Sequence, residues 1–290
     1  MKKLNQLQSY ILKKTATFLF LLVMFFLHPI AAQEIGVMSY NIKYDNVQDT
    51  VNNWDGRKEA MVSLIRHYGP KFIGMQEVLH KQLKYLDDNL ASYEYIGVGR
   101  DDGKLKGEFS PIFYDTSLFE LIKSETFWLS DTPDTISVGW DASMERICTY
   151  GLFKSIADDQ KLFVFNTHFD HVGEIAREKS VSLIIKKINE LNSKNHPIIL
   201  MGDLNLMPGE KPIQKLQETF TDGMKFVGNA FYGPIGTFNG FDADRVLDQR
   251  IDYIFTKNLQ VKSYIHIDDR MENNKYISDH LPVLLKFDYQ

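Results

Sequence analysis

The pattern of apolar and polar positions along the chain predicts a mixture of strands and helices. Short apolar runs bounded by turn residues predict strands, and apolar residues that recur every three or four positions predict helices. The longest helix is predicted over residues 174–192, where the apolar positions share one face. That face consists of Ala176, Val181, Ile184, Ile185, Ile188 and Leu191. Shorter helices are predicted at 56–68, at 80–90 and near 211–218. Strands are predicted at 34–42, 71–78, 93–99, 110–115, 118–129, 145–155, 161–170, 197–205, 250–255, 261–267 and 281–287.

The order of these elements favours two sheets packed face to face with helices outside. Strand–helix–strand units stand at both ends of the chain, and several consecutive strands lie between them. No internal repeat, low-complexity tract or long linker interrupts this order. We therefore expect residues 33–290 to form one domain.

The first thirty-two residues differ from the rest. A lysine-rich lead precedes the apolar run 17–27, and the small residues Ala31 and Ala32 follow it. This layout predicts a secretory signal over residues 1–32. Because the run is shorter than the ~20 residues that span a bilayer, we expect cleavage and no membrane span in the mature chain. Export to the periplasm or the exterior is then expected, with a retained anchor as the alternative.

Charge and cysteine content exclude several classes of function. The net charge is −5, and the lead contributes lysines but no acid, so the remaining domain is more acidic still. An acidic domain has no general electrostatic attraction for nucleic acid or anionic membranes. The single cysteine, Cys148, excludes an internal disulfide and a cysteine-based zinc site. Its place in the apolar run 145–155 favours a packed core thiol.

Acids, amides and histidines stand at the ends of most predicted strands. The stretch IILMGDLNLMP (198–208) runs from an apolar strand into Asp203 and Asn205. Taken alone, it fits a turn or a catalytic pair on one face of an extended segment. Because several other strand ends carry matching groups, the sequence predicts one convergent polar site. Its members are Asn41, Glu77, His168, Asp170, Asp203, Asn205, Asp252, Asp279 and His280.

These groups suit phosphate chemistry with a hard metal ion. Carboxylate and amide oxygens favour Mg²⁺, with Mn²⁺ as the alternative, over zinc. One such ion uses only one or two carboxylates, so other acids are left for proton transfer or for orienting a histidine. His280, with Asp252 available, fits an imidazole held by a carboxylate. Arg146 would offer a forked cationic contact to a phosphate.

Seven motifs resemble one known family. SYNIKYD, GMQEV, ERICTYGLF, FNTHFDHVG, GDLNLMPG, RIDYIF and SDHLPV stand in the order and approximate spacing of the endonuclease/exonuclease/phosphatase family. The resemblance covers residues 34–288. It implies an α+β fold: a four-layer α/β/β/α sandwich of two packed mixed β-sheets flanked by helices, as in deoxyribonucleases.

The resemblance also implies which residues bind the metal and the phosphate. Glu77 resembles the family's main Mg²⁺ ligand and Asn41 its partner, while Asp279 would lie at the metal. Arg146 matches the phosphate-binding arginine. The ion, the arginine and the histidines would share the negative charge that develops during hydrolysis.

The remaining motif positions imply catalytic roles. Asp203 resembles the carboxylate that orients or deprotonates the attacking water, and Asn205 its partner that also contacts the phosphate. His280 resembles the phosphate-contacting histidine held by Asp252, and His168 the second active-site histidine. The implied reaction is in-line attack of water on phosphorus without a covalent enzyme intermediate.

The substrate is less defined than the reaction, because one catalytic core serves both phosphodiesters and phosphomonoesters. We expect a phosphodiesterase of nuclease type, with a phosphomonoesterase for sugar, inositol or nucleotide phosphates as the alternative. The loops 99–111, 131–145 and 229–245 would make the choice. A non-catalytic binding module is disfavoured because every motif position is present. The sequence implies a phosphate-ester substrate and no stable protein partner.

Overall fold

The computed structural model describes residue 1 and residues 34–289. Residues 34–290 group into one compact unit by their internal contacts. The predicted secretory signal at residues 1–32 falls almost entirely outside the described part, so it stays a prediction. None of the helices within the described part combines the length and the apolar character that crossing a membrane requires.

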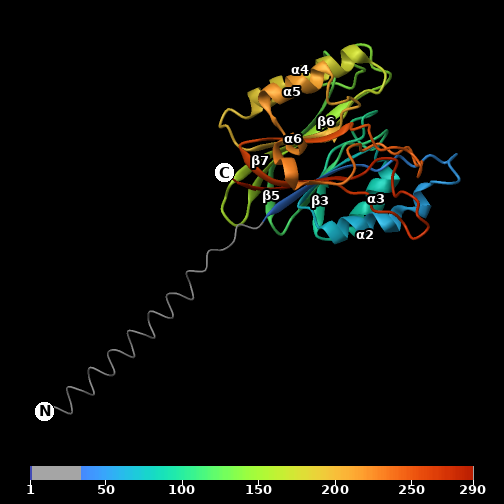
Figure 1. Ribbon diagram of the computed structural model, residues 1–290. Helices are drawn as coiled ribbons and strands as arrows, with labels where there is room; N and C mark the ends of the chain where they lie inside the picture. The colour runs from blue at the N-terminus through green and yellow to red at the C-terminus, as the bar shows by residue number, and fades with distance from the viewer. Residues whose placement is uncertain (2–33, 290) are drawn as a thin grey trace. The chain divides into compact units, whose positions relative to one another are not determined.

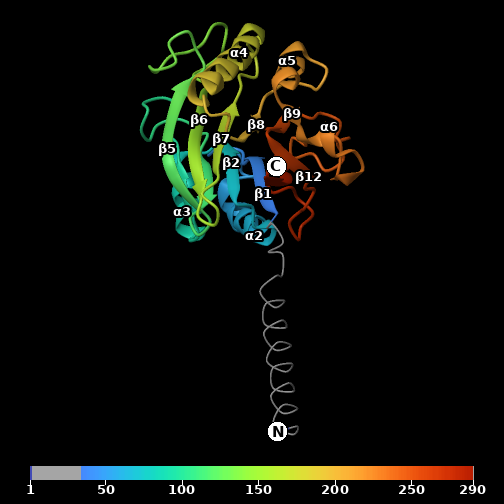
Figure 2. The ribbon, with the colours of Figure 1, turned by 90° about the vertical axis from the view of Figure 1, so that its left-hand side faces the viewer.

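The described strands form two mixed sheets, of seven and six strands. Figure 2 shows β5, β6, β7 and β8 of the smaller sheet side by side. The larger sheet has the order β10-β12-β13-β1-β2-β4-β3 and the smaller one the order β5-β6-β7-β8-β11-β9. The strands of the larger sheet are β1 (Ile35–Asn41), β2 (Phe72–Gln76), β3 (Tyr93–Ile96), β4 (Ile112–Asp115), β10 (Phe231–Tyr232), β12 (Leu259–His266) and β13 (Val283–Tyr289). Those of the smaller sheet are β5 (Phe119–Trp128), β6 (Ile147–Ser155), β7 (Lys161–His168), β8 (Ile198–Asp203), β9 (Thr221–Asp222) and β11 (Asp252–Lys257).

Helices cover the outer face of each sheet, so the predicted four-layer α/β/β/α arrangement is confirmed. Figure 1 shows α4 and α5 on one side and α2 and α3 on the other. The helices are α2 (Lys58–Tyr68), α3 (His80–Asn89), α4 (Glu174–Leu191), α5 (Lys211–Thr219) and the short α6 (Gly223–Val227), with 3₁₀ turns η1 (Trp54–Gly56) and η2 (Gly228–Ala230).

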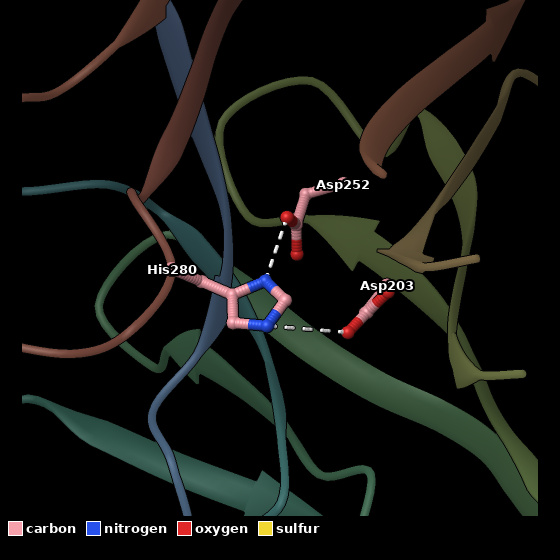
Figure 3. A group of neighbouring side chains, drawn as sticks. All are labelled: Asp203, Asp252 and His280. Carbon is pink, nitrogen blue, oxygen red and sulfur yellow. Dashed lines mark hydrogen bonds and ion pairs between the residues drawn. The ribbon is translucent and has the colours of Figure 1, made fainter. Parts of the chain in front are cut away.

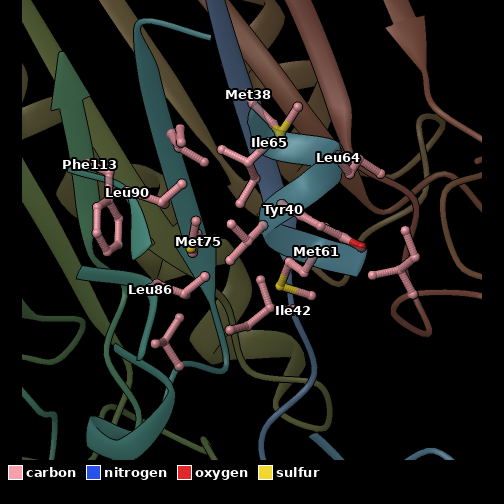
Figure 4. Packing of buried hydrophobic residues seen from close by; sticks show 14 of the residues in the cluster. Met38, Tyr40, Ile42, Met61, Leu64, Ile65, Met75, Leu86, Leu90 and Phe113 are labelled. Carbon is pink, nitrogen blue, oxygen red and sulfur yellow. The ribbon is translucent and has the colours of Figure 1, made fainter. Parts of the chain in front are cut away.

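Three apolar clusters hold the layers together. The first lies between α2 and α3 and the larger sheet, where Met61 and Ile65 pack with Met38 and Met75 (Figure 4). The second lies between α4 and α5 and the smaller sheet. The third fills the space between the two sheets. Burial of this apolar surface is the main force that fixes the sheets against each other.

The strand directions bring several polar ends to one place. β1 runs parallel to β2, and β7 runs parallel to β8, so their carboxyl ends lie at matching edges. β11 runs antiparallel to β8, and its first residue, Asp252, pairs in register with Asp203. His168 pairs with Asp203 from the other side. Three candidate residues therefore lie next to one another on three adjacent strands.

Two features differ from the prediction or were missed by it. The strand predicted to reach residue 205 ends at Asp203, and α6, β9 and β10 were not predicted. These three elements span only a few residues each, too short for a periodic pattern to show. Cys148, in contrast, is fully buried in β6 as expected.

We expect Gly202→Ala to destabilise the fold. Gly202 pairs with Thr167 of β7, and a Cβ at this position would collide with the Thr167 carbonyl oxygen of the adjacent backbone. The free energy of unfolding should fall by about 3 kcal/mol, as for other forced overpacking, measured by urea denaturation. Gly209→Ala is the control, because nothing lies within 4 Å of its Cβ position. An effect no larger than that of the control would contradict this account.

Candidate active site

A pocket of about 720 Å³ opens where the polar strand ends meet. It is bordered by the ends of β7 and β8 in the smaller sheet and by loops that include those after β1, after β2, after β3 and before β13. Asn41 and Asp252 are fully buried behind it. The predicted residues that line the pocket are Glu77, Arg146, His168, Asp203, Asn205, Asp279 and His280.

Asn41 links the two halves of the site. It is the last residue of β1, and its Nδ2 donates to Glu77 Oε1 and to Asp203 Oδ2, each at 3.0 Å. Glu77 follows β2 with a left-handed backbone (φ 59°), so the chain turns there and leaves its side chain on the pocket wall. One amide thus joins carboxylates from two different sheets.

Glu77 and Asp279 face a common cation. Lys43 Nζ lies 3.4 Å from Glu77 Oε2 and 3.3 Å from Asp279 Oδ2. Burial alone would raise the pKa of Glu77, but Lys43 and the amide of Asn41 hold it below its ordinary value. Two carboxylates that already share one positive charge form a donor set suited to a hard divalent ion.

His280 lies between two aspartates (Figure 3). Its Nδ1 contacts Asp252 Oδ2 at 2.9 Å, and its Nε2 lies 3.7 Å from Asp203 Oδ2. Burial alone would lower the pKa of His280, but the charges of Asp252 and Asp203 raise it to about 10. Burial and the neighbouring Asp252 raise the pKa of Asp203 to about 7. The ring is therefore charged at neutral pH, and Asp203 is poised to exchange a proton.

Asp203 and Asn205 are related by a turn, which decides between the two alternatives that the sequence left open for this stretch. Asn205 N donates to Asp203 Oδ1 at 3.0 Å, and Asn205 has a left-handed backbone (φ 48°). An aspartate that binds the backbone two residues on is a common turn device. The turn and the convergent site thus occur together, because the turn itself places the Asn205 side chain beside His168.

The network around His168 assigns its tautomer. Asn205 Nδ2 donates to the Phe169 carbonyl at 3.0 Å, which fixes the orientation of the amide. The same NH₂ lies 3.2 Å from His168 Nε2, so this nitrogen accepts and Nδ1 carries the proton. Burial and the nearby Arg146 charge lower the pKa of His168, which keeps the ring neutral.

Glu108 and Arg100 belong to the site but were not singled out from the sequence. The buried Nδ1 of His168 bonds to no other residue among those described, and it lies 3.9 Å from Glu108 Oε2. Arg100 holds both oxygens of Glu108, at 2.9 and 3.0 Å. Both residues stand in the loop 99–111 that was expected to choose the substrate. An acid directly before the apolar run that becomes β4 was the available signal.

Arg146 is buried at the pocket wall. Its Nε lies 3.4 Å from Asp170 Oδ2 and its Nη2 lies 3.0 Å from Nδ1 of the exposed His171. Asp170 does not line the pocket; it accepts from Ser143 Oγ at 2.7 Å and from backbone amides of the same loop. Burial alone would raise the pKa of Asp170, but these bonds and Arg146 lower it. Asp170 thus acts as a fixed anion that orients Arg146.

Arg57 is a third residue that the sequence did not reveal. It is 2% exposed and donates to the carbonyls of Ile42, Lys43 and Ile277 at 2.6, 2.7 and 3.1 Å. These bonds tie the segment after β1 to the segment before Asp279. An arginine at the start of a helix usually lies on the surface, so its pattern gave no indication of this role.

The fold and the site define a class of protein, the hydrolases built on a two-sheet sandwich with a polar pocket at the strand ends. The chain belongs to the Endonuclease/Exonuclease/phosphatase family, whose model matches residues 38–280. Members of this family are phosphoester hydrolases that generally use a divalent metal.

Two solved structures and one relative found by sequence agree with this assignment. An endonuclease/exonuclease/phosphatase from Bacteroides vulgatus is 37% identical, covers 89% of this chain and 99% of its own, and superposes with a TM-score of 0.84. A mannosyl-6-phosphatase from Bacteroides thetaiotaomicron is 36% identical, with 88% and 100% coverage and a TM-score of 0.83. An uncharacterized protein of Acanthamoeba polyphaga mimivirus is 30% identical over 260 residues, 82% of this chain and 94% of its own.

Proposed function

We propose that this protein hydrolyses a small phosphate ester with the help of Mg²⁺, or Mn²⁺ in its place. The observation that carries the proposal is the position of Asp203. Its carboxylate has a pKa of about 7 and accepts a hydrogen bond from the same Asn41 amide as Glu77. Glu77 and Asp279 in turn both contact the ammonium of Lys43, which marks a position suited to a cation. A base beside a metal position is what activation of a water molecule requires.

Glu77 and Asp279 would hold the ion. When bound, the ion would neutralise charge on the phosphate and on the leaving oxygen. Asp203, Asp252 and His280 form another group whose possible ligand atoms lie within 4.8 Å of one another. We favour Glu77 and Asp279, because Asp252 is already bonded to His280 and Mg²⁺ prefers oxygen ligands.

The chain's own residues supply the rest of the reaction. Asp203 takes a proton from the attacking water as the water oxygen bonds to phosphorus. The ester P–O bond breaks on the opposite side, and the departing alkoxide takes a proton from solvent. The charged His280 and the guanidinium of Arg146 stabilise the phosphate oxygens as negative charge develops. Asn205 and the neutral His168 fix the phosphate orientation.

A phosphomonoester of a sugar or a similar polyol is the substrate that we favour. The pocket volume of about 720 Å³ fits a small molecule. The acidic net charge of the chain gives little attraction for long nucleic acids. The relative that is 36% identical over its whole length is a mannosyl-6-phosphatase. The phosphodiester expected from the sequence stays the second candidate, because the catalytic residues serve both ester classes.

Metal removal and a substrate panel test this proposal. EDTA should abolish hydrolysis of p-nitrophenyl phosphate, and Mg²⁺ or Mn²⁺ should restore it. Mannose 6-phosphate and glucose 6-phosphate should then exceed bis-p-nitrophenyl phosphate and single-stranded DNA by roughly ten-fold or more in kcat/KM. Full activity in EDTA would overturn the metal dependence. Faster cleavage of the diesters would overturn the substrate class alone.

A further inference from the structure

A lysine occupies the position between the two proposed metal ligands. The ammonium of Lys43 lies 3.4 Å from Glu77 Oε2 and 3.3 Å from Asp279 Oδ2. Its side chain is 30% exposed, so it has room to move, whereas the two carboxylates are largely buried. Lys43 and its neighbour Tyr44 also line the pocket. The lysine thus reaches the carboxylates from the side that faces a bound substrate.

Hydrogen bonds fix the backbone of Lys43 at the edge of the pocket. Lys43 N donates to Asn41 Oδ1 at 3.1 Å, and its carbonyl accepts from Arg57 Nη2 at 2.7 Å and from Gln82 Nε2 at 2.9 Å. The residue also has a left-handed backbone (φ 56°), which is uncommon for a side chain other than glycine, asparagine or aspartate. The placement of this lysine is therefore part of the architecture of the site.

We propose that Lys43 is a built-in counter-cation that competes with the divalent ion for Glu77 and Asp279. The proposal rests on the metal dependence proposed above. An ammonium and a divalent ion repel each other strongly a few ångströms apart, so both cannot share the two carboxylates. Metal binding must displace the ammonium, and the flexible lysine stem allows it to turn toward the pocket.

A phosphate in the pocket would give the displaced ammonium an anionic partner. The cost of breaking two ion pairs then weakens metal binding to the free protein and is recovered when an anion binds. Phosphate should therefore strengthen metal binding, and by thermodynamic reciprocity the metal should strengthen phosphate binding. Lys43 couples the two, which favours assembly of the complete site only around a substrate.

Direct binding of Mn²⁺ to the purified full domain, by calorimetry or electron paramagnetic resonance without substrate, tests this inference. Lys43→Met should bind Mn²⁺ on the order of ten-fold more tightly than the wild type. Lys43→Arg keeps the charge and should stay close to the wild type. Lys81→Met is the matched control. Lys81 lies in α3 and pairs with Asp45, which is in the same loop as Lys43, but it contacts neither Glu77 nor Asp279.

Inorganic phosphate provides a second measurement. It should tighten Mn²⁺ binding to the wild type several-fold more than to Lys43→Met, and circular dichroism confirms that each variant is folded. Equal Mn²⁺ affinity in the wild type and Lys43→Met, or weaker binding by the variant, would overturn the role of Lys43 alone. Failure of every variant to bind Mn²⁺ would overturn the proposed metal dependence, and this inference with it.

Discussion

Asp203→Asn should lower kcat for phosphate-ester hydrolysis by about 10²–10⁴-fold, the usual contribution of a general base. Asparagine has the shape of aspartate, but it has one oxygen acceptor where Asp203 uses two, for Asn205 N and for Asn41 Nδ2. It cannot take a proton from water. Steady-state kinetics at saturating metal measure the effect, and KM should change far less than kcat.

Stability separates this catalytic effect from unfolding. Because the folded-state pKa of Asp203 is raised from 3.8 to about 7, its stabilising contribution is present below pH 4 and is lost as pH rises through 7. Asp203→Asn lacks this loss, so its thermal midpoint should fall less between pH 5 and pH 8 than that of the wild type. Asp222→Asn is the control: it breaks a buried pair with Arg250 and should reduce stability but not kcat. Wild-type kcat in Asp203→Asn would contradict the proposed role.

The fold was predictable because its strongest signals are local. The apolar run 198–203 is buried at every position, and the helix 174–191 was predicted to within one residue. A short apolar run bounded by turn residues is typical of a buried strand, and apolar residues at helical spacing are typical of an amphipathic helix. The convergence of the strand ends follows from the two-sheet arrangement, so Asn41, Glu77, Asp203 and Asp279 were expected near one another.

The residues that hold the site together were harder to predict. Glu108 comes within 3.9 Å of His168 because the loop 99–111 is held in place by distant segments, as where Phe109 pairs with Val78. Arg57 likewise binds the carbonyls of Ile42 and Ile277. Such contacts depend on tertiary packing, which no local pattern encodes. The turn between Asp203 and Asn205 shows the same limit, because the residue types were compatible with both a turn and an extended strand.

The second large effect expected is that of Asp252→Asn, which should change the pH dependence of the reaction. Asp252 is the carboxylate that holds His280 Nδ1 at 2.9 Å, and the two aspartates around this ring raise its pKa to about 10. Without the charge of Asp252, burial dominates and the pKa of His280 falls toward or below its ordinary value of 6.5. At pH 8 the ring would then be neutral, and kcat/KM should fall by about 10²-fold.

The profile of kcat/KM between pH 5 and 10.5 measures this prediction. The wild type should gain activity as Asp203 ionises near pH 7 and lose it as His280 deprotonates near pH 10. In Asp252→Asn the alkaline limb should move down by more than one pH unit. Linkage gives the same sign for stability: the raised pKa of His280 stabilises the fold fully below pH 6.5, and this contribution is lost as pH rises through 10. Asp252→Asn should lack that decline in stability, whereas Asp222→Asn should keep the wild-type pH profile of kcat/KM. An unchanged alkaline limb in Asp252→Asn would show that His280 is not held in its charged form by this carboxylate.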